Sequence, residues 1–252
     1  MKIAIASGKG GTGKTTISVN LAQMYAAPVQ LLDCDVEEPN AHLFLRRERI
    51  NEEIVSIPTP VVSEKLCNGC GECSRFCEYH AIAVLGKEPL IFPEMCHGCG
   101  GCKMVCPTKA IAEVERRIGI LETSISDNIT LISGRLDVGV PLAPPLIRAL
   151  KKKICANLPT VIDAPPGTSC PVIAAVRDTD LVLLVTEPTP FGLHDLRLAV
   201  DMIRVLRIPC GVIVNRMGIG DERVHSFCQK EKIPVLLNIP DDRRIAENYS
   251  RG

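Results

Sequence analysis

Short apolar runs that do not alternate with polar residues recur along the chain. Strands of a parallel sheet produce this pattern when helices cover both faces of the sheet, because both sides of each strand are then buried. The pattern predicts strands at Ile3–Ala6, Val29–Asp33, Thr160–Asp163, Leu181–Thr186, Gly211–Asn215 and Val235–Ile239.

Segments of helical character separate most of these runs. They predict helices at Lys14–Ala26, Ala143–Lys152, Val172–Arg177, Leu193–Leu206 and Glu222–Lys230. The segments Arg117–Thr123 and Asn128–Asp137 instead indicate a two-stranded excursion, with its turn at Ser126–Asn128. The alternation as a whole predicts an α/β fold with a doubly wound, mostly parallel sheet.

The first predicted strand leads into a glycine-rich loop. Gly8, Gly13, Lys14 and Thr15 have the Walker A spacing, in which glycines let backbone N–H groups converge on phosphate oxygens at a helix N-terminus. We expect Lys14 to reach the β- and γ-phosphates of ATP and Thr15 to bind Mg²⁺. The loop residues expected to contact the nucleotide are Gly8, Lys9, Gly10, Gly11, Thr12, Gly13, Lys14, Thr15 and Thr16.

Eight of the 13 cysteines belong to an internal repeat with an offset of 29 residues. Each unit has the spacing C-x₂-C-x₂-C-x₃-C, which is the bacterial ferredoxin pattern for [4Fe–4S] clusters. In that pattern three closely spaced thiolates bind one cluster and the fourth binds the other. The predicted ligand sets are therefore Cys67, Cys70, Cys73 and Cys106 for one cluster, and Cys96, Cys99, Cys102 and Cys77 for the second.

Two alternatives to clusters fit the cysteines less well. Zinc sites use paired CxxC knuckles separated by a longer loop, which the repeated triple spacing does not provide. Disulfides are disfavoured because cytosolic thiols are held reduced. The repeat lies within residues 64–113, and the remaining ~200 residues suffice for one α/β domain. We expect a P-loop domain at 1–63 and 114–252, with a dicluster ferredoxin module inserted at 64–113 after the second strand.

Polar residues follow several predicted strands, at the carboxyl edge where such sheets bind ligands. Asp33 and Asp35 close the second strand, and Asp163 closes the third, with Gly167 shortly after it. Asp33 equally fits a cap or turn residue. Asn215 ends a later strand and offers both a donor and an acceptor to a purine edge.

The segment Lys9–Thr16 resembles the deviant Walker A motif of the MinD, ParA and nitrogenase iron protein superfamily. The resemblance implies that Lys9 reaches the nucleotide of a partner subunit, so that two chains enclose two ATP molecules. It also implies that Asp35, in switch I, orients the attacking water and that Asp163, in Walker B, holds Mg²⁺ through water. Gly167, in switch II, would sense the γ-phosphate. Lys9, Lys14 and Asp35 are thus the expected catalytic residues.

The same resemblance assigns the adenine to two later segments. In the superfamily these segments correspond to Asn215 and Arg216, and to Pro240 and Asp241.

The sequence stops at Ser250–Gly252, where relatives would be expected to continue with a further helix. A membrane-anchoring terminal helix of the MinD kind is therefore not expected.

Charge and hydropathy narrow the range of partners. Lys plus Arg and Asp plus Glu both number 29, so no electrostatic footprint indicates nucleic acid or an anionic membrane. No signal peptide or membrane-spanning run is visible, and we expect a cytoplasmic protein.

The combined motifs predict an ATP-hydrolysing homodimer that couples its nucleotide state to two [4Fe–4S] clusters. One interpretation is electron transfer to a redox partner. The alternative is an ATP-dependent carrier or assembly factor for iron–sulfur or other metal cofactors, with an assembly protein as its partner. A switch that positions DNA or membranes is disfavoured by the neutral charge.

Overall fold

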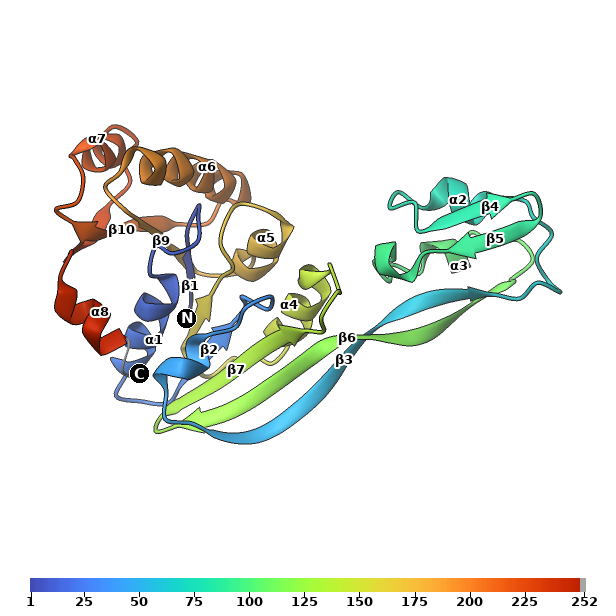
Figure 1. Cartoon of the computed structure of the whole chain (residues 1–252), viewed down its shortest axis with the longest axis horizontal. Helices are drawn as coiled ribbons and strands as arrows, with labels where there is room; N and C mark the ends of the chain where they lie inside the picture. The colour runs from blue at the N-terminus through green and yellow to red at the C-terminus, as the bar shows by residue number, and fades with distance from the viewer. Residues whose placement is uncertain (250–252) are drawn as a thin grey trace.

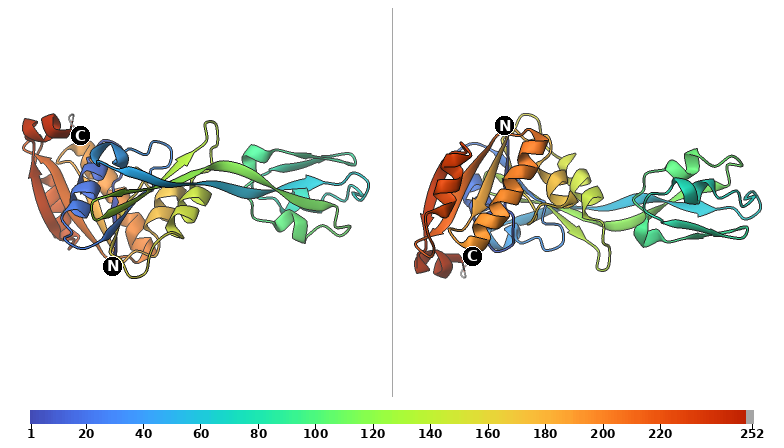
Figure 2. Two further views of the ribbon diagram at one scale, coloured as in Figure 1. Left: turned by 90° about the horizontal axis from the view of Figure 1, so that it is seen from below. Right: turned by 90° about the horizontal axis from the view of Figure 1, so that it is seen from above.

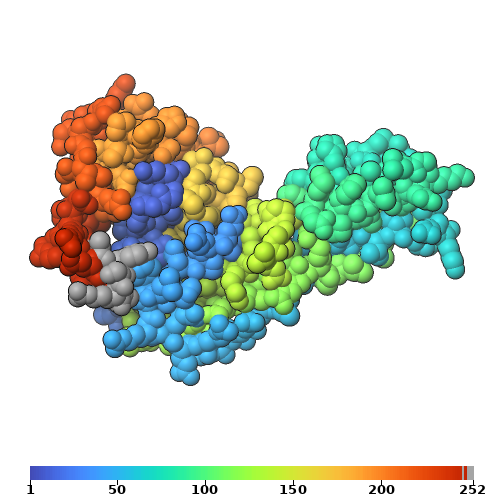
Figure 3. Space-filling model, viewed as in Figure 1, coloured from blue at the N-terminus to red at the C-terminus, as the bar shows by residue number. Residues whose placement is uncertain are grey.

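The computed structural model describes residues 1–249, so the chain end at Ser250–Gly252 lies outside the described residues. A large α/β body carries a small lobe at the end of a long two-stranded ribbon (Figure 1). In the space-filling view the lobe stands apart from the body (Figure 3).

Within residues 1–249 the body is built on a nine-stranded sheet of order β11-β10-β9-β1-β8-β2-β7-β6-β3. All neighbouring pairs from β11 to β7 are parallel, whereas β7–β6 and β6–β3 are antiparallel. The strands are β1 (Lys2–Ala6), β2 (Val29–Asp33), β3 (Glu48–Val62), β6 (Ile111–Ser126), β7 (Ile129–Leu136), β8 (Thr160–Asp163), β9 (Leu181–Thr186), β10 (Cys210–Met217) and β11 (Val235–Pro240). The predicted mostly parallel sheet is confirmed, and each predicted parallel strand is present.

Helices cover both faces of the sheet. One face packs against α1 and the short 3-10 helix η1, and the other packs against the four helices from α4 to α7. The helices of the body are α1 (Lys14–Gln23), η1 (Ala41–Phe44), α4 (Ala143–Lys151), α5 (Cys170–Val176), α6 (Pro190–Leu206), α7 (Arg223–Lys230) and α8 (Arg243–Tyr249). The four strands β1, β2, β8 and β9 lie between these layers and are almost wholly buried, as their apolar sequences predict.

The predicted two-stranded excursion is wrong in one respect, because β6 and β7 join the main sheet. β7 pairs in parallel with β2 along its length, and β6 pairs with β3 from Glu48 to Val62. The sequence analysis did not predict β3, so the insert follows the third strand rather than the second. Many β3 side chains are exposed, which removes the apolar signal on which the strand predictions relied.

The β3–β6 ribbon leaves the sheet at a β-bulge. The pairing register shifts between Val55 and Ser56, which leaves Ile118 of β6 as the extra residue. The Ile118 side chain is fully buried in the core of the body. Beyond this point the ribbon twists away from the body and carries the lobe (Figure 2).

The lobe repeats one structural unit. Its elements are α2 (Glu72–Phe76), β4 (Ile82–Leu85), β5 (Glu88–Ile91), the 3-10 helix η2 (Pro93–Met95) and α3 (Gly101–Met104). β4 and β5 form a separate antiparallel pair. The left-handed backbone at Gly71 and His80 recurs at Gly100 and Lys109, with the 29-residue offset of the cysteines.

Candidate functional site

The glycine-rich loop runs from the end of the central strand β1 to the start of α1. Gly13 has a φ of 91°, and a Cβ atom there would lie 2.6 Å from the Asn215 amide nitrogen. A Cβ at Gly8 would lie 2.3 Å from the backbone oxygen of Asp195 in α6. Both positions therefore require glycine, and they bring the loop close to Asn215 near the end of β10 and to Asp195 in the N-terminal part of α6.

Lys14 is a buried cation among carboxylates at the start of α1. Burial lowers the pKa of Lys14, and the charges of Asp163 and Asp35 oppose that effect. Burial raises the pKa of Asp35, and the charge of Lys14 opposes this effect by lowering it. The structure thus brings together Lys14, Asp35 and Asp163, which the sequence places far apart.

Asp163 has the free oxygen that a Mg²⁺ site requires. Its Oδ1 accepts a hydrogen bond from the Ser18 hydroxyl at 3.0 Å, and the Thr15 side chain acts to lower its pKa. Its Oδ2 is buried and has no hydrogen-bond partner within residues 1–249. Burial raises the pKa of Asp163 to about 6. A buried oxygen without a partner is costly, so the donor set of Asp163 and Thr15 fits a bound divalent cation.

Asp33 ends β2 and makes structural contacts with the segment that follows it. The β2–β8 register places Asp33 beside Asp163. Its carboxylate accepts the backbone N–H groups of Asp35 at 3.2 Å and Ala41 at 3.0 Å. Burial and the charge of Asp163 raise the pKa of Asp33 well above its usual value. These contacts match the cap or turn role, and of the two carboxylates after β2 it is Asp35 whose charge acts on Lys14.

Gly167, in the segment after β8, contacts the start of the phosphate loop. It has a φ of 94°, and its N–H donates to the Ser7 carbonyl at 3.0 Å. A Cβ atom at Gly167 would meet no other atom within 4 Å, so space is open beside it. The N–H expected to sense the γ-phosphate therefore contacts the loop that would hold that phosphate.

The predicted adenine segments meet beside the phosphate loop. The Asn215 amide donates to the Thr12 carbonyl at 2.9 Å. The N–H of Asp241, just after Pro240, donates to the Met217 carbonyl at 3.0 Å and ties the end of β11 to β10. The structure thus gathers the later strand ends at the edge of the sheet that carries the loop.

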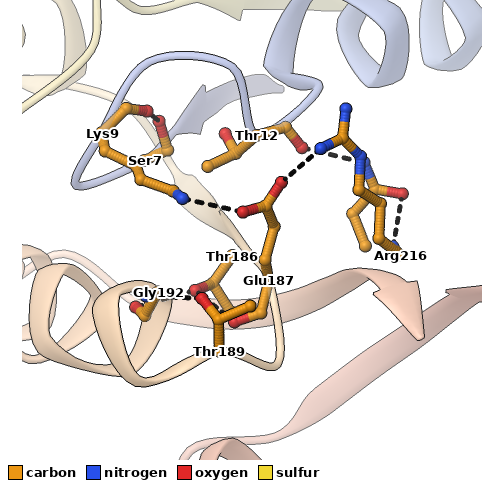
Figure 4. Close-up of polar contacts among 9 residues, drawn as sticks. Ser7, Lys9, Thr12, Thr186, Glu187, Thr189, Gly192 and Arg216 are labelled. Carbon is orange, nitrogen blue, oxygen red and sulfur yellow. Dashed lines mark hydrogen bonds and ion pairs between the residues drawn. The ribbon is translucent and has the colours of Figure 1, made fainter. Parts of the chain in front are cut away.

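Lys9 contacts a residue that the sequence analysis missed. Its Nζ lies 2.8 Å from Oε2 of Glu187, whose Oε1 lies 3.0 Å from Nη1 of Arg216 (Figure 4). Glu187 is the first residue after β9, so its place at a strand end was the signal that could have identified it.

The cysteines of the lobe surround two cavities. One cavity is lined by the predicted set Cys77, Cys96, Cys99 and Cys102, together with other residues that include Phe76, Ile82 and Gly100. The other is lined by the predicted set Cys67, Cys70, Cys73 and Cys106, with residues that include Gly69, Gly71 and Ile111. Each cavity therefore takes three cysteines from one repeat unit and one from the other.

Backbone N–H groups point at cysteine sulfurs in equivalent places of the two units. The N–H of Ala81 lies 3.3 Å from Cys77 Sγ, and that of Ala110 lies 3.2 Å from Cys106 Sγ. Such contacts stabilise thiolate ligands of iron–sulfur clusters. Within the described part of the chain, no three His, Cys, Asp or Glu side chains are grouped to hold a single metal ion.

No helix within residues 1–249 is both long and apolar enough to cross a membrane.

Relatives with known sequences match the whole length of this chain. An uncharacterized protein of Methanocaldococcus jannaschii is 33% identical over 266 residues, covering 100% of this chain and 90% of its own. An iron–sulfur cluster carrier protein of Aquifex aeolicus is 26% identical over 275 residues, covering 99% of this chain. This chain spans only 60% of that carrier protein.

The fold resembles a solved structure at low sequence identity. The septum site-determining protein MinD of Pyrococcus horikoshii, complexed with Mg-ADP, superposes with a TM-score of 0.57 at 20% identity. The match covers 98% of this chain and 84% of that protein.

Residues 3–252 match the family described as the CobQ/CobB/MinD/ParA nucleotide binding domain. The phosphate loop, the parallel sheet and this match agree that the chain belongs to the CobQ/CobB/MinD/ParA family of nucleotide-binding proteins.

Proposed function

We propose that this protein hydrolyses ATP as a homodimer and couples its nucleotide state to two [4Fe–4S] clusters held by the lobe. The observation that carries this proposal is the pair of four-cysteine cavities, which lie in a lobe attached to a nucleotide-binding body. The clusters would supply one-electron chemistry when bound. Electron transfer to a protein partner is the activity that this arrangement supports.

Each residue of the nucleotide site has a separate proposed role. Lys14 would hold the phosphates, Thr15 would bind Mg²⁺, and Asp163 would hold the same ion through water. Asp35, beside Lys14, orients the attacking water. The residues that would hold the adenine are Asn215, Arg216, Pro240 and Asp241.

A short series of contacts links switch I to the ribbon. The carbonyl of Val36, next to Asp35, accepts the N–H of Leu136 at 2.9 Å. The neighbouring N–H of Asp137 donates to the carbonyl of Ile118, the bulged residue of β6, at 3.0 Å. A movement of switch I on ATP binding would therefore act on the point where the ribbon leaves the body.

The link between body and lobe is tested by the response of the clusters to ATP. We expect ATP with Mg²⁺ to change the reduction potential of at least one cluster by tens of millivolts, or to change the rate at which a chelator removes its iron. Coupling energies of about 1 to 3 kcal/mol are common, and ~59 mV corresponds to a tenfold change for one electron. Lys14→Ala should abolish the response. Equal potentials and chelation rates in the apo, ADP and ATP states would contradict the coupling.

A second candidate is an ATP-dependent carrier of iron–sulfur clusters. The name of the Aquifex aeolicus relative, an iron–sulfur cluster carrier protein, favours this candidate. Four cysteines around each cavity favour retention of these two clusters instead. Mixing the loaded protein with an apo-ferredoxin distinguishes the two, because a carrier loses iron to the acceptor when ATP is present, whereas an electron-transfer protein keeps its iron.

The homodimer is tested through Lys9. Lys9→Ala should weaken ATP-dependent dimerisation and hydrolysis together, because its expected target is the phosphate held by the partner subunit. Nucleotide binding to the monomer should remain. Sedimentation with a non-hydrolysable ATP analogue measures this, and an undiminished ATP-bound dimer of the variant would contradict the role of Lys9.

A further inference from the structure

Glu187 holds two cations that come from distant parts of the chain. Lys9 lies in the phosphate loop, 178 residues before Glu187, and Arg216 lies at the end of β10. We call Lys9, Glu187 and Arg216 the Glu187 cluster (Figure 4). The side chain of Glu187 is only 7% exposed, so its charge is largely removed from water and depends on these two partners.

The loop after β9 places the carboxylate of Glu187 firmly. The Thr189 side chain caps the N-terminus of α6 by accepting the N–H of Gly192 at 3.0 Å. The Thr186 hydroxyl donates to the Gly192 carbonyl at 2.9 Å, on the other side of Glu187 in the chain. Glu187 is therefore anchored by its neighbours, whereas Lys9 is a long side chain on a glycine-rich loop and is 35% exposed.

We propose that Glu187 is a positioning residue that keeps Lys9 on its own subunit until the phosphates of ATP on a partner subunit replace the carboxylate. The proposal rests on the nucleotide sandwich of the proposed function, in which Lys9 must reach across the interface. Lys9 has one ammonium group, and while that group is paired with Glu187 it is directed within its own subunit.

Arg216 makes this exchange feasible. A buried carboxylate left without a partner is strongly unfavourable. When Lys9 leaves, Glu187 still has the Arg216 guanidinium at 3.0 Å. Arg216 comes from the strand end that also carries Asn215, which contacts the phosphate loop. The Glu187 cluster thus allows Lys9 to change partners without leaving Glu187 unpaired.

The proposal is tested by Glu187→Gln, which keeps the shape of the side chain and removes its charge. Without nucleotide, an amine-reactive acetylating reagent should modify Lys9 several-fold faster in this variant than in the wild-type protein. Peptide mass spectrometry measures the rate. With a non-hydrolysable ATP analogue, the variant should dimerise at about fivefold lower protein concentration, because Lys9 no longer leaves an ion pair.

Two further variants make the result specific. Glu187→Gln should have no effect on dimerisation in a Lys9→Ala background, because Glu187 acts through Lys9. Glu53→Gln, which removes a surface ion pair with Lys153, should leave both measurements unchanged. Thermal unfolding checks that each variant is folded.

Each outcome has a defined meaning. Equal acetylation of Lys9, or weaker dimerisation of the Glu187→Gln variant, would overturn the proposal. The wild-type protein could stay monomeric with the analogue while acetylation of Lys9 still rises in Glu187→Gln. That result would overturn the ATP-bound dimer of the proposed function, and with it the exchange of Lys9 between Glu187 and a partner's phosphates. The pairing of Lys9 with Glu187 would stand.

Discussion

Lys14→Ala should weaken ATP binding at least about 100-fold, because the phosphates lose a cation that donates charge-assisted hydrogen bonds. Lys14 is buried at the start of α1 and lies near two carboxylates, so no other cation of the loop occupies its place. Lys9, the other lysine of the loop, is paired with Glu187. Titration with a fluorescent ATP analogue measures the loss.

Asp35→Ala provides the matched contrast to Lys14→Ala. It should leave ATP affinity within a few-fold and lower turnover roughly 100-fold, because orienting water matters mainly in the transition state. Asp35→Asn should behave alike, since it keeps the shape but not the charge. Hydrolysis at the unmodified rate in either variant would contradict the role assigned to Asp35 in switch I. Thermal unfolding of the apo proteins serves as the control for folding.

Serine substitution of single cysteines in the lobe should remove one cluster at a time. Anaerobically prepared protein should contain about eight iron and eight sulfide per chain. Cys77→Ser should lower the iron to about four, and so should Cys99→Ser. Because these two cysteines line one cavity, the double variant should still hold about four. Iron analysis and electron paramagnetic resonance of the reduced protein measure the outcome.

A second pair of substitutions distinguishes the cavities from the order of the cysteines in the chain. Cys70 belongs to the same repeat unit as Cys77 but lines the other cavity. Cys70→Ser combined with Cys77→Ser should therefore remove nearly all the iron. Retention of about four iron would show that each unit binds its own cluster. Cys155→Ser, an exposed cysteine of the body, should change nothing. A colourless zinc protein that remains active would contradict the clusters altogether.

The parts of this protein that are predictable from sequence depend on local chemistry. A strand covered on both faces must be apolar along its length, so β1, β2, β8 and β9 were visible as apolar runs. A phosphate loop requires glycines at particular positions, and Gly8 and Gly13 have no room for a Cβ atom in the structure.

The ribbon was not predictable in the same way. β3 is long, and its first half is exposed and rich in charged residues. That half is held by its pairing with β6, far along the chain, rather than by burial of its own side chains. The exposed half of such a ribbon does not need apolar residues. Its sequence therefore lacks the periodicity by which a strand is recognised.

Sequence alone determined the phosphate loop, the strands that carry it and the duplication of the cysteine units, because each depends on residue types at short, fixed spacings. The tertiary structure decided which distant groups meet. It placed Lys9 on Glu187, Asp163 beside Asp33, and each set of three cysteines near a fourth from the other unit. Such pairings depend on strand order, on register and on how distant segments of the chain are connected in space. The spacing of residues along the chain does not reveal them.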